Sequence, residues 1–135
     1  MKVVVVSTQH LAGNAAARES VRRFVERGDV VRHISLAAAD SVDGVSETLA
    51  LGPAASGASR GVVGRVVVRI HPGSLARQLT RAVHRSSTAS TWLDDADVVV
   101  GADTATAQLL WTRARRRPAV PHIVGLDAAL TRTSG

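Results

Sequence analysis

Two short polar segments carry the residue types that could bind a ligand, and each follows a run of valines. The valines occupy residues 3–6 and 98–100. If both runs are parallel strands, the segments after them lie where the strands end, which is where open parallel sheets bind ligands. We therefore predict a cleft between residues 7–14 and residues 101–106. Its candidate ligand-binding residues are Ser7, Thr8, Gln9, His10, Gly13, Asn14, Gly101, Asp103 and Thr104.

The first segment has the position of a phosphate-binding turn but lacks the residues that define one. Gly13 would let a ligand approach the backbone, and free N–H groups around Asn14 would favour an anion. Dinucleotide-binding turns have three glycines in the pattern G-x-G-x-x-G, and a P-loop needs a lysine, whereas the only lysine here is Lys2. Both signatures are excluded. An ordinary turn, with Asn14 as a helix N-cap, is the alternative interpretation.

Histidines at strand ends are candidates for proton transfer. His10 follows the first strand, where it could act as a general base or bind a phosphate, and His71 follows a later apolar run. His33 lies inside an apolar run and His122 at the start of one, so we expect both to be structural. His10 is the single candidate catalytic residue.

Two further patterns suggest chemistry that their positions argue against. The acids Asp94, Asp95 and Asp97 precede a strand and so belong to the opposite edge of the sheet, which favours a solvated turn over a magnesium site. Ser59 sits in a G-x-S-x-G pattern, but this segment leads into an apolar run instead of a helix, so no nucleophile elbow is expected. The chain has no cysteine, which excludes disulfides, thiolate metal sites and cysteine nucleophiles. We expect neither a metal nor a cofactor.

The chain is strongly basic, with a formal net charge of +6. One interpretation is a GC-rich coding sequence, which favours arginine; the other is a surface adapted to phosphate, nucleic acid or an anionic membrane. Nucleic acid is disfavoured, because aromatic platforms and known binding motifs are missing. Peripheral membrane contact stays an alternative. The candidate basic patch comprises Arg77, Arg81, Arg85, Arg115, Arg116 and Arg117.

The length and the apolar pattern predict the fold that positions the candidate site residues. A chain of 135 residues is expected to form a single domain. The apolar run at its start is too short for a signal peptide, and no run reaches the ~20 residues of a membrane span, so we expect a cytoplasmic protein. Near-continuous apolar runs predict strands buried on both faces. These five runs are residues 3–6, 30–36, 62–70, 98–100 and 122–126.

Helical patterns separate most of these runs. One begins after Asn14 and ends at Gly28, and a second begins after Ser74. A third begins after Asp103 or Thr104, stops at Pro118, and has its apolar face at Ala107, Leu110, Trp111 and Ala114. This order predicts an α/β domain over residues 1–135, with three layers and a five-stranded, mostly parallel, Rossmann-like sheet. Residues 37–61 are expected to be an irregular loop, with helical turns as an option at residues 45–51.

Three stretches together resemble one family. They read MKVVVVST (residues 1–8), RFVERGDVVRHISL (23–36) and WLDDADVVVGAD (92–103). The chain is similar here to the N-terminal Rossmann-like domain of GT-B glycosyltransferases, especially the retaining group that uses nucleotide sugars. In that family a helix ending in E-R-G-[HD] leads into the second strand, and A-D-V-V-V marks a later strand.

The resemblance implies an acceptor-side domain whose first loop borders the cleft to a donor-binding domain. By position, Gly13 matches the glycine of that loop, and residues 101–104 match a cleft-facing loop. The sequence departs from the family in two respects: the paired glycines are reduced to one, and 135 residues do not hold the second, donor-binding domain. The expectation is therefore a glycosyltransferase-like domain that is not a complete enzyme alone. Its partners would be a donor-binding domain or chain and a sugar or lipid-linked acceptor.

Two other functions stay open at this point. One is a nucleotide- or anion-binding regulatory module built on the same sheet. The other is a basic adaptor that binds nucleic acid or a membrane through the arginines of the candidate basic patch.

Overall fold

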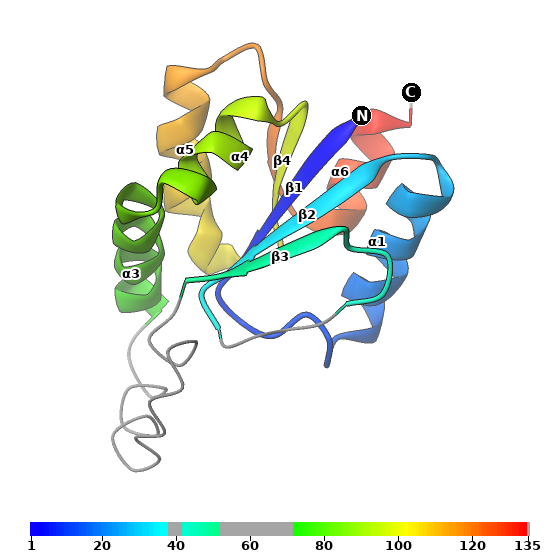
Figure 1. The fold of residues 1–135 in the computed structure, drawn as a ribbon, viewed down its shortest axis with the longest axis horizontal. Coiled ribbons are helices and arrows are strands. Elements are labelled where there is room, and N and C mark those ends of the chain that lie inside the picture. Colours follow the sequence, from blue (N-terminus) through cyan, green and yellow to red (C-terminus); the bar gives the residue numbers. More distant parts are fainter. Residues whose placement is uncertain (38–41, 52–71, 135) are drawn as a thin grey trace.

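A computed structural model describes residues 1–37, 42–51 and 72–134, and shows a five-stranded sheet in the order β3-β2-β1-β4-β5 (Figure 1). All neighbouring strands are parallel. This confirms the α/β class and the Rossmann-like arrangement. The strands are β1 (Lys2–Ser7), β2 (Val30–Ser35), β3 (Glu47–Ala50), β4 (Val98–Gly101) and β5 (His122–Val124).

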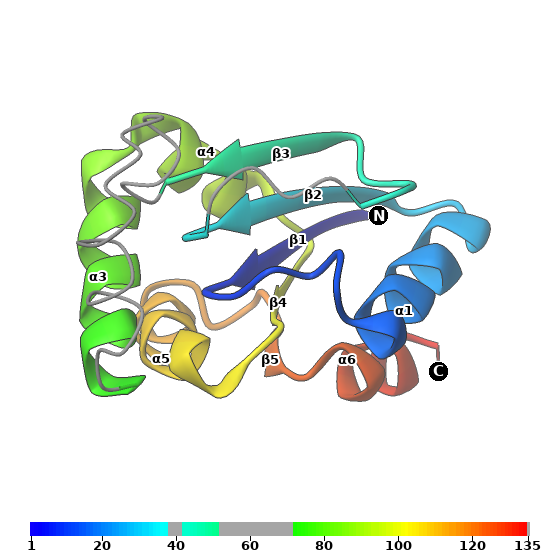
Figure 2. The ribbon, with the colours of Figure 1, turned by 90° about the horizontal axis from the view of Figure 1, so that it is seen from below.

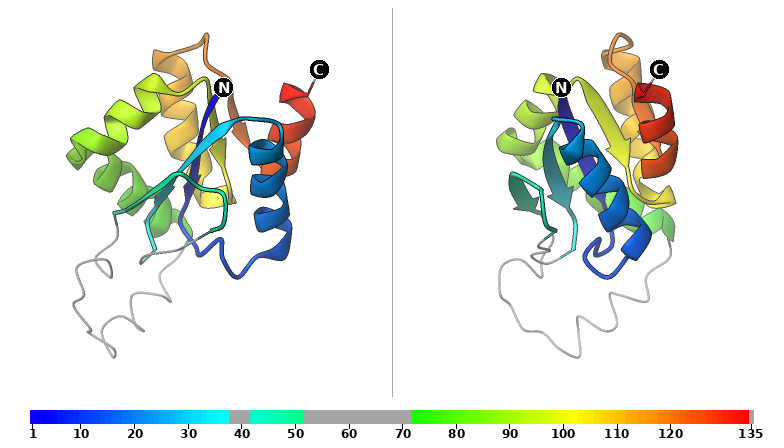
Figure 3. Two further views of the ribbon diagram at one scale, coloured as in Figure 1. Left: turned by 45° about the vertical axis from the view of Figure 1, so that its right-hand side comes forward. Right: turned by 90° about the vertical axis from the view of Figure 1, so that its right-hand side faces the viewer.

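Helices cover both faces of the sheet (Figures 1 and 2). One face carries α1 (Ala15–Glu26) and α6 (Leu126–Thr133), which lie side by side in both views of Figure 3. A short 3₁₀ turn, η2 (Thr104–Thr106), leads from β4 into α5. The opposite face carries α3 (Pro72–Arg85), α4 (Ser87–Asp95) and α5 (Ala107–Arg116).

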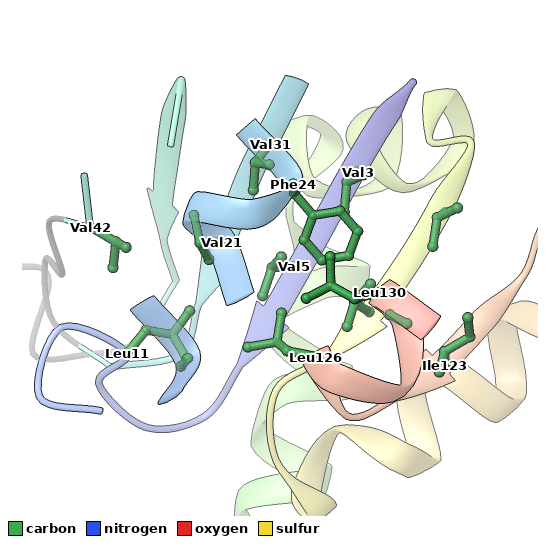
Figure 4. Packing of buried hydrophobic residues seen from close by; sticks show 14 residues of the cluster. Val3, Val5, Leu11, Val21, Phe24, Val31, Val42, Ile123, Leu126 and Leu130 are labelled. Carbon is green, nitrogen blue, oxygen red and sulfur yellow. The ribbon is translucent and has the colours of Figure 1, made fainter. Parts of the chain in front are cut away.

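The central position of β1 explains its unbroken valines. Val3 and Val5 pack with Phe24 and Leu130 under α1 and α6 (Figure 4). Val4 and Val6 point to the other face and pack under α3, α4 and α5. Since burying one valine stabilises the fold by about 1.5–3 kcal/mol, both sets of alternating positions favour an apolar side chain.

The first helix begins and ends as its sequence predicts. The Asn14 side chain accepts a hydrogen bond from the Ala17 N–H at 3.1 Å, so Asn14 is the N-cap of α1. Gly28 follows the helix with φ = +93°, a left-handed conformation that glycine adopts most easily. The turn after α1 is therefore fixed by residue type.

One strand lies where the sequence predicts an irregular loop. Residues 62–70 lie outside the described residues, and the third strand of the sheet is β3, inside the segment expected to be irregular. The prediction of helical turns at residues 45–51 is wrong. The Ser46 N–H donates to the Val31 carbonyl and the Leu51 N–H to the Ser35 carbonyl, both at 2.8 Å, so pairing with β2 outweighs a weak local helical pattern.

Four helices also differ from expectation. The α6 helix is not predicted, and α3 begins at Pro72, so the predicted start after Ser74 is wrong. The α4 helix is not predicted from sequence, although its Ser86 N-cap accepts a bond from the Ala89 N–H at 3.1 Å. In α5, Leu109, Leu110 and Arg113 take the buried positions, and Trp111 is 63% exposed. The predicted apolar face that included Trp111 is therefore wrong in its rotation about the helix axis.

Candidate functional site

The two predicted ligand-binding segments meet at one edge of the sheet. β1 and β4 are neighbours, with Val6 opposite Gly101, and the Ala102 N–H donates to the Val6 carbonyl at 2.8 Å. The chain proceeds from β1 to β2 in one direction and from β4 to β5 in the other, so the strand order reverses between β1 and β4. Ligands of open α/β sheets bind at such a reversal.

A direct contact between Thr8 and Asp103 joins the two segments. The Thr8 N–H donates to Asp103 Oδ2 at 2.8 Å, and the Thr8 hydroxyl donates to Asp103 Oδ1 at 3.0 Å. A helical turn does begin after Asp103, as η2, but the Asp103 side chain does not cap it and the α-helix itself begins only after Thr106. Both oxygens of the Asp103 carboxylate bind the opposite loop.

Gly101 is needed where β4 ends because Thr106 packs against it. A Cβ atom at Gly101 would lie 2.0 Å from Thr106 Oγ1. This Thr106 hydroxyl donates to the Asp103 carbonyl at 2.6 Å, which fixes the backbone of the loop. Gly101 is buried and contributes to the site through packing.

Ser7 and His33 form a buried polar pair beneath the first loop. Ser7 Oγ lies 2.7 Å from His33 Nε2, and both residues are fully buried. The pair follows from the strand register, which places Val5 beside His33 and Ser7 beside Ser35. Ser7, a predicted ligand contact, thus lies in the interior, and a fully buried His33 is consistent with the structural role expected for it.

The remaining candidates, called the exposed rim, are exposed residues of the two loops that the Thr8–Asp103 contact joins. Leu11 is buried and anchors the first loop, whose Asn14 N–H donates to the Leu11 carbonyl at 2.9 Å. That N–H is therefore not free to bind an anion. A Cβ atom at Gly13 would meet no heavy atom within 4 Å, so the backbone there is open to a ligand. The exposed candidates are Gln9, His10, Gly13, Asn14 and Thr104.

The acids before β4 lie at the opposite edge of the sheet and are paired with cations or backbone. Asp97 accepts a bond from the Lys2 N–H at 2.7 Å, and Asp95 forms an ion pair with the Lys2 ammonium group at 3.0 Å. Asp94 pairs with the buried Arg113 at 3.1 Å. Within residues 1–37, 42–51 and 72–134, no cluster of His, Asp or Glu could hold a metal ion. The other sequence candidates, Ser59 and His71, lie outside the described residues.

The candidate basic patch is divided between two helices of one layer. Arg77, Arg81 and Arg85 are exposed on α3. Arg115 and Arg116 are exposed at the end of α5, and Arg117 follows, donating to the Asp94 carbonyl. None of the described helices is both long and apolar enough to cross a bilayer.

Comparison with known proteins does not assign the chain to a family. No protein-family model matches the chain, and no characterised protein matches its sequence.

Proposed function

We propose that the chain is the acceptor-side domain of a GT-B-type glycosyltransferase and that it binds its ligand at the ends of β1 and β4. One observation carries the proposal. Two of the stretches that resemble this family, residues 1–8 and 92–103, end on Thr8 and Asp103, the residues that hydrogen-bond to each other. Sequence similarity and contact geometry thus coincide at the edge where this fold class binds ligands.

The exposed rim would supply the binding groups. Gln9, Asn14 and Thr104 offer amide and hydroxyl groups that can donate to and accept from sugar hydroxyls. Gly13 leaves the backbone of the first loop accessible. In a complete transferase, His10 would accept the proton of the attacking acceptor hydroxyl. The Thr8–Asp103 contact would hold the two loops in register.

The nucleotide sugar would be bound by a second, donor-binding domain or chain, as in the GT-B arrangement. The acceptor would be a sugar or a lipid-linked sugar. A lipid-linked acceptor would place the domain at the periphery of a membrane.

Activity assays test whether the chain is inactive without a donor-binding domain or partner. We expect the purified chain to leave a panel of nucleotide sugars, such as UDP-glucose and GDP-mannose, unhydrolysed and untransferred. Rapid turnover of any of them by this chain without a partner would contradict the proposal.

Acceptor binding is tested separately by NMR titration with simple sugars and alkyl glycosides. We expect chemical-shift changes confined to residues 8–14 and 101–106. Gly13→Leu should abolish them without loss of stability, because the position is open. Ala119→Leu, an exposed change in the turn before β5, is the matched control and should bind as the unmodified chain does. Shift changes elsewhere would refute the assigned site.

One observation favours a second candidate, a nucleotide- or anion-binding regulatory module. Arg18 lies in the first turn of α1, which contains no acid, although a cation there opposes the helix dipole. A shallow depression beside this turn is lined by Ala15, Arg18, Glu19, Arg22, Val42 and Asp43. Stabilisation by a nucleotide or by phosphate, about 2.7 kcal/mol at a hundredfold excess over Kd, would favour the module. Loss of this effect in Arg18→Gln would place the anion at α1.

A further inference from the structure

The arginines of α3 and α5 have no acidic counterpart on their own helices. Neither α3 nor α5 contains Asp or Glu. In the part of the chain that the structure describes, Arg77, Arg81 and Arg85 are exposed and take part in no ion pair. We propose that this layer binds the surface of an anionic lipid bilayer. The basic surface comprises Arg77, Arg81, Arg85, Trp111, Arg115 and Arg116.

The opposite layer shows that this charge pattern is not general. On α1, Arg22 pairs with Glu19 at 2.5 Å and also with Glu26, and Arg23 pairs with Glu19 at 3.3 Å. These arginines are exposed too, but their charge is largely cancelled by neighbours one turn away.

The division between the layers is not complete, because Arg113 on α5 pairs with Asp94 and the exposed Arg18 on α1 takes part in no ion pair within the described residues. What distinguishes α3 is that all three of its arginines are exposed and, within the same ranges, unpaired. These α3 arginines lie on the side of the sheet opposite α1, and Figure 1 shows the two layers.

An exposed aromatic side chain accompanies the charge. Trp111 is 63% exposed, whereas Trp92 is buried at 9%. The Arg115 guanidinium lies over the Trp111 ring, 4.9 Å from its centroid. An indole ring beside arginines is suited to the interface of a bilayer, where its apolar body and its N–H group meet different surroundings.

The same features fit a bilayer better than a nucleic acid. Single strands are bound by several aromatic side chains on which successive bases stack, whereas Trp111 is the one exposed aromatic residue in the described ranges. A bilayer offers a continuous plane of phosphate groups, so arginines on two different helices can contact it without matching a groove or a base spacing. This inference does not depend on the ligand at β1 and β4.

Vesicle co-sedimentation tests the proposal with the full chain. We expect binding to vesicles of phosphatidylcholine and phosphatidylglycerol, weaker binding as salt rises from about 0.1 M to about 0.5 M, and little binding to phosphatidylcholine alone. The fluorescence of Trp111 should shift to shorter wavelength on binding. Trp111→Phe should lose that shift, since Trp92 is already buried.

Paired variants separate the basic surface from total charge. Removal of one arginine that contacts the membrane should weaken binding about five- to sixfold, so Arg81→Gln with Arg85→Gln should weaken it about thirtyfold. Arg22→Gln with Arg23→Gln removes the same formal charge from α1 and should change binding less than threefold. Circular dichroism checks that each variant is folded.

Three outcomes would overturn the proposal. The first is the absence of binding to anionic vesicles, and the second is equal loss in the α1 and α3 variants. The third is binding to a DNA duplex or single strand at the same phosphate concentration that is tighter than binding to the vesicles.

Discussion

Gly101→Ala should destabilise the chain strongly although the residue has no unusual backbone angle. The new Cβ would lie 2.0 Å from Thr106 Oγ1, about 1 Å short of the 3.0 Å below which such contacts essentially do not occur. It would also lie 3.1 Å from Thr106 Cβ and 3.2 Å from Leu110 Cδ2. Rotating the Thr106 side chain would relieve the first contact but not the other two.

The cost has two parts. Moving the Thr106 hydroxyl breaks its 2.6 Å bond to the Asp103 carbonyl, which costs about 1 kcal/mol. Overpacking against Thr106 Cβ and Leu110 adds about 1–3 kcal/mol. We therefore expect the free energy of unfolding to fall by about 2–4 kcal/mol, and Tm to fall by about 4 °C for each of these kcal/mol.

Urea unfolding followed by circular dichroism measures this cost. Gly13→Ala is the matched control, because its Cβ meets nothing within 4 Å, and its effect should stay within about 0.5 kcal/mol. In Gly101→Ala with Thr106→Ala, the two changes should cost at least about 1 kcal/mol less than the sum of the single variants. If the free energy of unfolding of Gly101→Ala were within about 0.5 kcal/mol of that of the unmodified chain, the close packing of Gly101 and Thr106 would be refuted.

Three further predictions concern polar groups. Asp103→Ala should lower the free energy of unfolding by about 1.5–3 kcal/mol, and much of this loss should be shared with Thr8→Val in a double-mutant cycle, because the two side chains hydrogen-bond. Additive losses would show that they do not interact. Arg113→Met should change stability by no more than about 1 kcal/mol, because burial disfavours the charge and lowers the pKa of Arg113 while the Asp94 carboxylate opposes that shift. A loss above about 3 kcal/mol on urea unfolding would argue that the ion pair with Asp94 is strongly stabilising. Burial lowers the pKa of His122 below its ordinary 6.5, so the unfolded chain binds the proton more readily and stability should fall as pH drops below about 6.5. His122→Gln should flatten that dependence in unfolding experiments from pH 5 to 8, and an unchanged slope would remove His122 as its cause.

The sheet could be predicted from sequence where strands are buried on both faces. Runs of valine leave few alternatives in β1 and β4, and Asn14 and Gly28 define α1 through local chemistry. The edge strand β3 could not be found in this way. Its residues are exposed or half-buried, and they form a strand because β2 offers unpaired backbone groups beside them.

The site was predictable in position but not in its contacts. The strand-end rule selected both loops, yet the pairing of Thr8 with Asp103 depends on the register between β1 and β4. The same holds for Ser7 and His33, which become partners only when β1 and β2 are aligned. The rotation of α5 that exposes Trp111 depends on Arg113 taking a buried position, and helical periodicity gives no reason to place a charged residue there.

The contact between Thr8 and Asp103 would limit the entry of a ligand that inserts between the two loops, whereas a ligand held on the exposed rim would leave the contact intact. A ligand that binds between the two loops must first separate them, and its apparent affinity is reduced by the small fraction of molecules in which the loops are apart. If opening costs about 2.7 kcal/mol, about one molecule in a hundred is open and the apparent Kd rises about a hundredfold. A partner that supplied its own hydrogen bonds to the Asp103 carboxylate would remove this cost. Ligand affinity would then depend on whether the partner is bound, without any contact between partner and ligand.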